Sequence, residues 1–344
     1  MTPSLADAGL LTLSFLIPLL VVVVAMPAYI RYLTRSGRVA DDVHKQPVTK
    51  VPLPAGPLLL AGALAGEVLV YAAFGSLVPV AVIGAAAIAF AIGLADDLYV
   101  LGGKTKPLLL LFAAAPLVLL VMVQTNLYLP ALAFPIFGMT SEHFSIYTAL
   151  AIVSFPVVAN AFNMMDSFNG EISWFTLLAT SALLFAVVLH ASFASGFSLA
   201  RVAATLPLLA VAAGFLIFNR FPSRVFDGDS GALMFGAMFA ALAVTGGVEI
   251  AAMVAIVPAI LNSFYILSSV RGFVERRTMK SRPTYMGEDG RLYASPEAGA
   301  PATLVRMLLL DGPMSERELV KAVAILTGIA CVLSGVTSLM TWVL

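Results

Sequence analysis

Three groups of aspartates lie where an apolar stretch of this sequence ends or begins, and their type and position suit them to chemistry. They are Asp96 with Asp97, Asp166, and Asp229 in the run Asp-Gly-Asp. Carboxylate and amide oxygens are the ligands that hard divalent cations prefer. Because ionised groups near the membrane are costly to desolvate, they usually mark function. Together the three groups predict a site for a metal-bound diphosphate.

Two lysines accompany the first pair of acids. Lys104 and Lys106 follow Asp96-Asp97, just before the next apolar stretch. Adjacent carboxylates raise each other's pKa unless a cation or a lysine offsets their charge. For Lys106 the alternative is a structural role, in which its stem lies along the membrane and its ammonium reaches the interface.

Asparagines accompany the second acid at helical spacing. Asn160, Asn163 and Asp166 recur every third position, so they share one face of a helix. Hydrogen bonding between helices is the structural alternative, and it fits Asn160 better than the terminal Asp166. Asn169 and the glycine after it are expected to end this helix.

The third group lies in a turn between two apolar stretches. We expect Asp227 to solvate this turn and the next helix to begin at about Ser230, a residue typical of an N-cap. The glycine between the two aspartates permits close backbone approach. Since a helix N-terminus favours anions, Asp229 is expected to reach a cation whose diphosphate ligand faces the helix amides.

The elements that must position these residues are membrane helices. The chain has 344 residues, of which 60% are hydrophobic and 11% charged, whereas about a quarter of a soluble domain is charged. This composition excludes a large cytosolic enzyme and a disordered scaffold. A net charge of zero offers no field for a nucleic acid, and one cysteine excludes an intramolecular disulfide framework. We expect one all-α polytopic membrane domain over residues 1–344.

Apolar stretches long enough to cross a bilayer recur along the whole chain. Weak boundaries at residues 75–76 and 246–247 leave nine to eleven spans open, with about ten favoured. The predicted spans are 10–30, 52–74, 77–95, 107–124, 145–163, 172–190, 200–218, 231–246, 248–270 and 321–343.

Basic residues divide the connecting loops into two sets. Eighteen of the nineteen lysines and arginines fall in one alternating set of loops, and only Arg201 lies elsewhere. The excess of positive charge predicts that this side is cytoplasmic and that both termini lie outside.

One loop is long enough to form a small structure of its own. Residues 271–320 are expected to be a cytoplasmic insertion between the last two spans. The segment from Pro283 to Ala294 predicts a β-hairpin, because Asp289-Gly290 is a favoured two-residue turn. Residues 302–310 are expected to form a short amphipathic helix. We expect the insertion to fold over a ligand at the acidic groups.

In this order and spacing the motifs resemble the polyprenyl-phosphate N-acetylhexosamine-1-phosphate transferases. The final loop, from Thr303 to Leu319, is similar to the eukaryotic and archaeal branch that uses dolichyl phosphate, and it lacks the histidine-rich motif of bacterial members. An archaeal enzyme fits this combination of a loop similar to the dolichyl-phosphate branch and no histidine-rich motif. The segments that carry the resemblance are Gly-Leu-Ala-Asp96-Asp97, Asn160-Ala-Phe-Asn163-Met-Met-Asp166-Ser-Phe-Asn169-Gly, Pro222-Ser-Arg-Val-Phe-Asp-Gly-Asp229, and Asp42-Val-His44-Lys45 with Pro52-Leu-Pro54-Ala-Gly56.

The resemblance implies a reaction and its partners. A dolichyl or other polyprenyl phosphate would attack the β-phosphorus of a UDP-N-acetylhexosamine, giving a lipid-diphosphate-sugar and UMP, with Mg²⁺ or Mn²⁺ as cofactor. Phosphoryl transfer mostly needs positioning and charge neutralisation. The protein would work in the lipid bilayer of a prokaryotic cell with its site facing the cytoplasm, as a single chain or a homodimer.

The resemblance also implies roles for individual residues. Asp96, Asp97 and Lys106 would be catalytic, and Asp229 with Asn163 would hold the metal. Asn169 would contact the uracil, and Arg276 or Arg277 the sugar or the diphosphate. The residues expected to bind substrate are Asn163, Asp166, Asn169, Lys45, Arg276, Arg277 and Arg282.

Two other functions remain open from the sequence. One is a bacterial-type undecaprenyl-phosphate sugar-1-phosphate transferase for cell-wall polymers. The other is a membrane transporter, whose binding residues would cluster near the bilayer midplane. Glu67 is the only ionisable residue well inside a predicted span, which favours an enzyme with its site at one membrane face.

Overall fold

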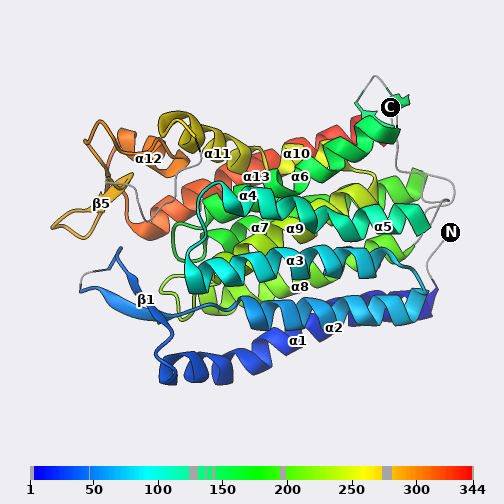
Figure 1. The fold of residues 1–344 in the computed structure, drawn as a ribbon, viewed down its shortest axis with the longest axis horizontal. Helices are drawn as coiled ribbons and strands as arrows, with labels where there is room; N and C mark the ends of the chain where they lie inside the picture. Colours follow the sequence, from blue (N-terminus) through cyan, green and yellow to red (C-terminus); the bar gives the residue numbers. More distant parts are fainter. Residues whose placement is uncertain are drawn as a thin grey trace.

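The chain folds into a bundle of long helices that run along one axis (Figure 1). A computed structural model describes residues 4–45, 47–123, 131–135, 138–141, 144–193, 199–272 and 281–342. Among these residues, nine helical segments are long and apolar enough to cross a membrane, and one bent pair of helices supplies a tenth span. The prediction of an all-α polytopic membrane protein with about ten spans is confirmed.

The described helices follow the predicted apolar stretches closely. They are α1 (Leu5–Arg35), α2 (Gly56–Phe74), α3 (Val78–Tyr99), α4 (Thr105–Leu110) with the 3-10 helix η1 (Leu111–Ala114) and α5 (Ala115–Val123), α6 (Phe144–Met165), α7 (Glu171–Phe193), α8 (Leu199–Asn219), α9 (Gly228–Gly246), α10 (Glu249–Ala255) with α11 (Val257–Ser269), and α13 (Glu316–Trp342).

Helix α9 forms the centre of the bundle. Every residue from Ser230 to Gly246 is buried, and α3, α6, α2 and α8 pack around the helix. A helix that is apolar on all sides is stable only inside a protein or a membrane. The position of α9 therefore fixes where its first residues, including Asp229, meet the surrounding helices.

Two predicted spans are not continuous α-helices. The fourth span contains the 3-10 helix η1 between α4 and α5, and the ninth bends by 67° between α10 and α11. Pro258 lies in the first turn of α11. Because proline lacks the amide that would continue the hydrogen bonding of α10, the helix restarts there in a new direction. The predicted span over 248–270 is therefore a bent pair of helices.

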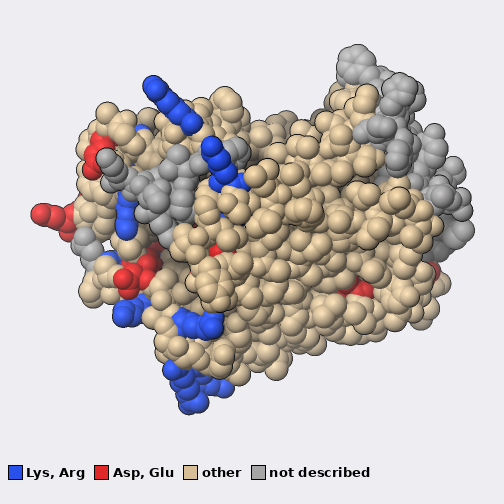
Figure 2. Space-filling view, viewed as in Figure 1, with Lys and Arg blue, Asp and Glu red and all other residues tan. Residues whose placement is uncertain are grey.

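The two ends of the bundle differ in charge. The antiparallel hairpins β1–β2 (Val39–Asp42 and Thr49–Pro52) and β5–β6 (Thr284–Met286 and Leu292–Ala294) lie at one end, which we call the basic end (Figure 1). Lys and Arg gather there, beside a broad uncharged surface (Figure 2). Both chain termini lie at the opposite end, with the hairpin β3–β4 (Ala131–Phe134 and Gly138–Ser141) nearby.

The insertion before α13 contains the expected hairpin and helix, with a different turn. Gly287 N–H donates to the Arg291 carbonyl and Gly290 N–H to the Gly287 carbonyl. The last hydrogen-bonded pair of the hairpin is therefore Gly287 with Arg291, and three residues, 288–290, form the turn instead of two. Gly290 takes a φ of +72°, which glycine adopts without strain. The helix α12 (Leu304–Leu308) follows, then η3 (Leu309–Asp311).

A second, smaller apolar core attaches this insertion to the bundle. Leu292 of β6 also pairs with Met314, which brings the hairpin to the start of α13. The residues of the core come from the loop before α7, the hairpin, α12, η3 and α13: Phe168, Leu292, Val305, Leu309, Leu319 and Val320. The insertion is thus packed beside the loop that carries Asn169.

The arrangement predicts the sidedness of four loops. Reporters placed at residues 45, 103 and 290 should lie on the same side of the membrane, and that side should be the cytoplasm because the basic residues gather there. A reporter at residue 196 should lie on the other side. Accessibility of single cysteines to a membrane-impermeant reagent measures this, and residues 103 and 290 on opposite sides would contradict a single site.

Candidate active site

The first turn of α9 is capped by a side chain from another helix. The helix begins at Gly228, and neither Asp227 nor Ser230 caps it with its side chain. Asp97 of α3 does so instead. Its Oδ1 accepts a hydrogen bond from the Asp229 N–H at 2.8 Å, and its Oδ2 accepts one from the Ser230 N–H at 3.1 Å. The predicted N-cap at Ser230 is wrong, and these two amides bind Asp97 rather than lie open to a phosphate.

Three glycines make room for this contact. A β-carbon on Gly93 would lie 2.5 Å from the Asp229 carbonyl oxygen, and one on Gly56 would lie 2.3 Å from the Ser230 hydroxyl. Gly228 has a φ of +73°, and a β-carbon there would lie 2.7 Å from Asp97 Oδ2. Helices α2 and α3 therefore approach the start of α9 more closely than any residue with a side chain would permit.

Lys106 joins two of the predicted acidic groups. Its Nζ lies 2.7 Å from Asp96 Oδ2 and 3.1 Å from Asp229 Oδ2. The side chains of Lys106 and Asp96 are 11% and 1% exposed, whereas that of Asp229 is 23% exposed. Lys104 is exposed and lies outside this cluster. Lys106 is thus buried between carboxylates, and the snorkelling alternative for it does not hold.

The charges of this cluster favour binding of a cation. The carboxylates of Asp96 and Asp229 both contact the ammonium group of Lys106, and the carboxylate of Asp97 binds the backbone amide of Asp229. Asp96 and Asp97 also accept backbone hydrogen bonds, from Leu101 and from the start of α9 respectively. Of the two carboxylates that contact Lys106, that of Asp229 is the more exposed, so it is the one that a ligand can reach.

Backbone hydrogen bonds join residues 52–56 to the turn before α9. The N–H groups of Ala55 and Gly56 donate to the carbonyls of Phe226 and Asp227, at 2.9 and 3.1 Å. In return, Phe226 N–H donates to the Pro52 carbonyl at 2.9 Å. Two motifs about 170 residues apart in the sequence therefore form one short backbone ladder.

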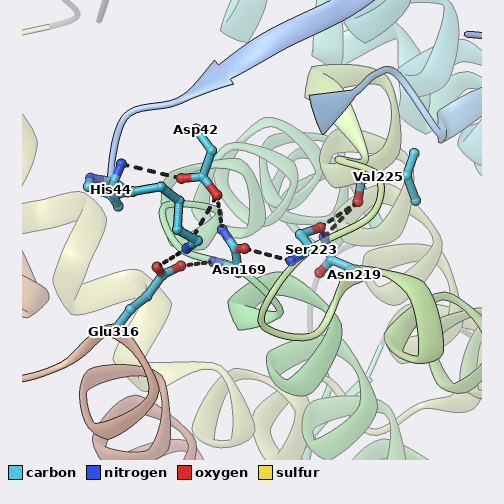
Figure 3. A network of polar contacts seen from close by, with 8 residues as sticks. Asp42, His44, Asn169, Asn219, Ser223, Val225 and Glu316 are labelled. Atoms are coloured by element: carbon cyan, nitrogen blue, oxygen red, sulfur yellow. Dashed lines mark hydrogen bonds and ion pairs between the residues drawn. The ribbon is translucent and has the colours of Figure 1, made fainter. Parts of the chain in front are cut away.

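Asn169 is the centre of a polar network that joins four segments (Figure 3). Its Nδ2 donates to Asp42 Oδ2 at 3.1 Å, and its Oδ1 accepts the Ser223 N–H at 2.7 Å. The Asn169 N–H donates to Glu316 Oε1 at 2.8 Å. Asn169 lies just before α7, four residues after α6 ends at Met165, so the prediction that it ends that helix is wrong. Its contact with uracil stays a prediction.

Lys45 belongs to the same network. Its Nζ pairs with Glu316 and, at 3.3 Å, with Asp42 Oδ2, and it lies 4.1 Å from the centroid of the Phe221 ring. Glu316 is buried at the first residue of α13. The sequence analysis did not single out Glu316, although an acid in the turn before the last apolar stretch is a signal that could have indicated it. The network holds the β1–β2 loop against the start of α13.

The structure gives the positions of some of the remaining predicted residues but not of all. Ala159 of α6 packs against Gly236 of α9, so Asn163, one turn nearer the basic end, lies toward the start of α9. Asp166 directly follows α6 and is half-buried. Arg282 is exposed before β5. Arg276 and Arg277 lie outside the described residues.

Asp227 is not a solvated turn residue as the sequence suggested. Its side chain is fully buried, and neither carboxyl oxygen has a hydrogen-bond partner among the described residues. Burial, together with the nearby charge of Asp166, raises the pKa of the Asp227 carboxyl well above its ordinary value. Asp227 therefore favours the protonated form in the folded protein.

The oxygen donors near α9 suit a Mg²⁺ ion that also binds water and substrate better than a metal whose ligands all come from the protein. Among the described residues, no three His, Cys, Asp or Glu side chains are grouped to hold a metal. Asp229 and Asn163 are both partly exposed. Mg²⁺ commonly binds one or two carboxylates and keeps waters and substrate phosphates as its other ligands, so a partly exposed carboxylate such as that of Asp229 suits it.

Comparison with known proteins places the chain in a family. Residues 79–247, which span α3 to α9, match the pattern of glycosyl transferase family 4. A provisionally named glycosyltransferase of Methanocaldococcus jannaschii is 32% identical over 281 residues, which are 81% of each chain. The chain belongs to glycosyl transferase family 4. The matched region contains Asp96, Lys106 and Asp229, so the family pattern covers the cluster around Lys106.

Two further relatives of this family-4 chain carry more specific names. One, from Saccharolobus solfataricus, is provisionally named a UDP-N-acetylglucosamine–dolichyl-phosphate N-acetylglucosaminephosphotransferase; it is 26% identical over 303 residues, 85% of each chain. The other, from Bacillus subtilis, is provisionally named an undecaprenyl-phosphate N-acetylglucosaminyl 1-phosphate transferase; it is 24% identical over 275 residues, 79% of this chain and 73% of the relative.

The burial of Asp227 predicts how stability depends on pH. The unfolded carboxyl loses its proton near pH 3.9, whereas the folded one keeps it to higher pH. Above about pH 4 the folded state binds more protons than the unfolded state, so stability falls as pH rises. Asp227→Asn removes this loss. The variant should melt above the wild type by at least about 2 °C at pH 7, and the gap should narrow toward pH 4.

Thermal melts of the purified protein in detergent between pH 4 and pH 8 measure this gap. Asp41→Asn is the matched control, because Asp41 is an exposed aspartate on β1. A gap between wild type and Asp227→Asn that does not change with pH would contradict the protonated state of Asp227.

Proposed function

We propose that this protein transfers N-acetylglucosamine 1-phosphate from UDP-N-acetylglucosamine to dolichyl or another polyprenyl phosphate. The products are the lipid-diphosphate-sugar and UMP, and the reaction begins the assembly of a lipid-linked glycan for protein N-glycosylation. The observation that carries the proposal is the buried Lys106 between Asp96 and Asp229 at the end of a membrane bundle. Membership of glycosyl transferase family 4 and the name of the Saccharolobus relative support it.

The chemistry needs no activating base. An oxygen of the lipid phosphate forms a bond to the β-phosphorus, and the bond from that phosphorus to the bridging oxygen breaks, so UMP leaves. Both reactants are anions, and catalysis therefore consists of positioning and charge neutralisation. Lys106 supplies a fixed positive charge for the phosphates, and Asp96 and Asp229 orient its ammonium group. Asp97 positions the backbone that carries Asp229.

A divalent cation completes the charge balance in this proposal. Asp229 and Asn163 would hold Mg²⁺ or Mn²⁺, which supplies positive charge to the diphosphate of the sugar nucleotide. The partial exposure of Asp229 supports this assignment, because the ligand must reach the carboxylate from the aqueous side.

The position of the cluster suits substrates that arrive from two phases. A sugar nucleotide is soluble in water, whereas a polyprenyl phosphate lies in the bilayer with its phosphate at the surface. The cluster lies at the basic end, which we assign to the cytoplasm from the distribution of Lys and Arg. Arg276, Arg277 and Arg282 are the proposed contacts to the sugar or the diphosphate, on the insertion that packs beside Asn169.

The Bacillus relative favours one alternative acceptor. Its name specifies undecaprenyl phosphate, so the same chemistry on that lipid is the second candidate function. A transporter is less well supported. Glu67 is buried in α2, and its carboxyl oxygens have no hydrogen-bond partner among the described residues, but the described acids with ionic partners gather at the basic end.

Release of UMP tests the proposed function directly. Purified wild-type protein with UDP-N-acetylglucosamine, Mg²⁺ and either dolichyl or undecaprenyl phosphate should release UMP and form the lipid-linked sugar. The preferred lipid decides between the two acceptors. If neither lipid phosphate gives UMP across a range of Mg²⁺ and Mn²⁺ concentrations, the proposed reaction is wrong.

The substitution Asp229→Asn tests the assigned site. It keeps the shape of the side chain and an acceptor for Lys106 but removes the charge that balances the cation. Turnover should fall at least about a hundredfold, the effect of losing about 2.7 kcal/mol of transition-state stabilisation. The variant should still fold, since a partly exposed carboxylate contributes little packing. A magnesium titration of UMP release measures the loss, with a thermal melt of the same sample.

Asp41→Asn is again the matched control, since it removes the same charge from the basic end outside the cluster. Folded Asp229→Asn protein with near-normal turnover at low magnesium would show that Asp229 does not hold the metal, even where the wild type carries out the proposed reaction.

A further inference from the structure

A cavity at the basic end lies outside the cluster around Lys106. It has a volume of about 490 Å³, within the range of about 300–1,000 Å³ that is typical of small-molecule sites. Asp96, Lys106 and Asp229 are absent from its lining. Its walls come from the start of α7, the turn after α8 and the first three turns of α13: Asn169, Trp174, Leu178, Phe221, Arg317, Val320, Lys321, Ala324 and Ile325.

The lining changes from cationic to apolar along the helix direction. Helices α7 and α13 pack side by side, and both begin at the basic end. Arg317 and Lys321 occupy the first two turns of α13, and Ala324 and Ile325 lie one turn deeper. Trp174, near the start of α7, is 41% exposed, and tryptophan favours the boundary between membrane and water. The cavity thus presents two cations at the interface and an apolar groove below them.

The two cations have no anionic partner among the described residues. Arg317 and Lys321 are four positions apart on one helix, where like charges repel. The acids beside them are engaged elsewhere, because Glu316 pairs with Lys45, and Glu318 pairs with Arg291 at 3.0 Å. Arg317 lies 4.7 Å from the Phe221 ring centroid, which orients its guanidinium at the cavity wall. The cavity therefore carries an unneutralised positive charge.

We propose that this cavity binds one anionic phospholipid of the membrane. The phosphate of its headgroup lies between Arg317 and Lys321, and an acyl or isoprenoid chain follows Leu178, Ala324 and Ile325 along the bundle. Basic pockets between membrane helices are a recurrent site for anionic headgroups. The apolar lower part of the lining does not suit a sugar nucleotide, and Lys106 is absent from the lining, so the proposed lipid is structural and not the acceptor.

The lipid would support the loops around the candidate active site. Asn169 and Phe221 line the cavity and also belong to the network that joins Asp42, Lys45 and Glu316. A ligand that binds the folded state alone raises its stability. Binding of the lipid should therefore stabilise these loops whether or not the chain carries out the proposed transfer.

Lipid binding to the purified full-length chain tests the proposal. Native mass spectrometry and thermal melts are recorded in detergent with dioleoylphosphatidylglycerol or with zwitterionic dioleoylphosphatidylcholine. The wild type should bind one phosphatidylglycerol and melt higher with it, and phosphatidylcholine should have little effect. The double variant Arg317→Gln, Lys321→Gln should bind phosphatidylglycerol at least tenfold more weakly.

Two further variants separate this site from general charge and folding effects. Arg31→Gln with Arg35→Gln removes two exposed cations with the same spacing from α1 at the same end, and it should bind lipid like the wild type. Ala324→Trp keeps both cations and fills the groove, and it should also lose binding. Because Ala324→Trp leaves both charges in place, it tests the groove even where the variant Arg317→Gln, Lys321→Gln fails to fold.

Any one of the following results would overturn the proposal. They are equal binding of phosphatidylcholine, unchanged phosphatidylglycerol binding by Ala324→Trp, the same loss of binding in the α1 control, and displacement of the lipid by millimolar inorganic phosphate, which would indicate a site for a free anion. Polyprenyl phosphate that binds here more tightly than phosphatidylglycerol would also overturn it. None of these measurements uses UMP release, so failure of this proposal and failure of the proposed function are distinguishable.

Discussion

The two hydrogen bonds from the start of α9 to Asp97 are the contact on which the site depends. A carboxylate that accepts two helix amides gains charge-assisted hydrogen bonds, worth about 1.5–3 kcal/mol each, and a favourable interaction with the helix dipole. Since Asp97 comes from α3, the same bonds that cap α9 also fix α3 against it. Asp96 and Asp229 are thereby held at the two sides of Lys106, and the site exists only while α3 and α9 stay in contact.

Backbone shape makes this contact possible. Gly93, Gly56 and Gly228 leave no space for a β-carbon at the start of α9. In a membrane, helices gain little from apolar contact alone, because lipid is as apolar as leucine, so close packing and polar contacts decide their association. Glycines beside the acidic motifs therefore belong to the chemistry of the site as much as to the fold.

The periphery of the site is held by a second set of contacts with a different origin. Asn169, Lys45 and Glu316 join the β1–β2 loop to the first turn of α13 (Figure 3). The proposed lipid cavity has Asn169 and Phe221 as a shared wall with this network. The membrane surface, the loops and the cluster around Lys106 are thus connected through packed and hydrogen-bonded groups, and lipid composition becomes a variable that can affect the site.

The sequence by itself determined the membrane class, about ten spans, the charged end and the acidic motifs, because apolar length and charge distribution are local properties of the chain. It also favoured Lys106 over Lys104 through a family resemblance. Only the tertiary structure decided that Asp97 caps α9, that Asp227 is buried and that Glu316 binds Lys45. These are contacts between residues more than a hundred positions apart, or burial by distant helices, and no local pattern specifies which partner a carboxylate meets once the helices have packed.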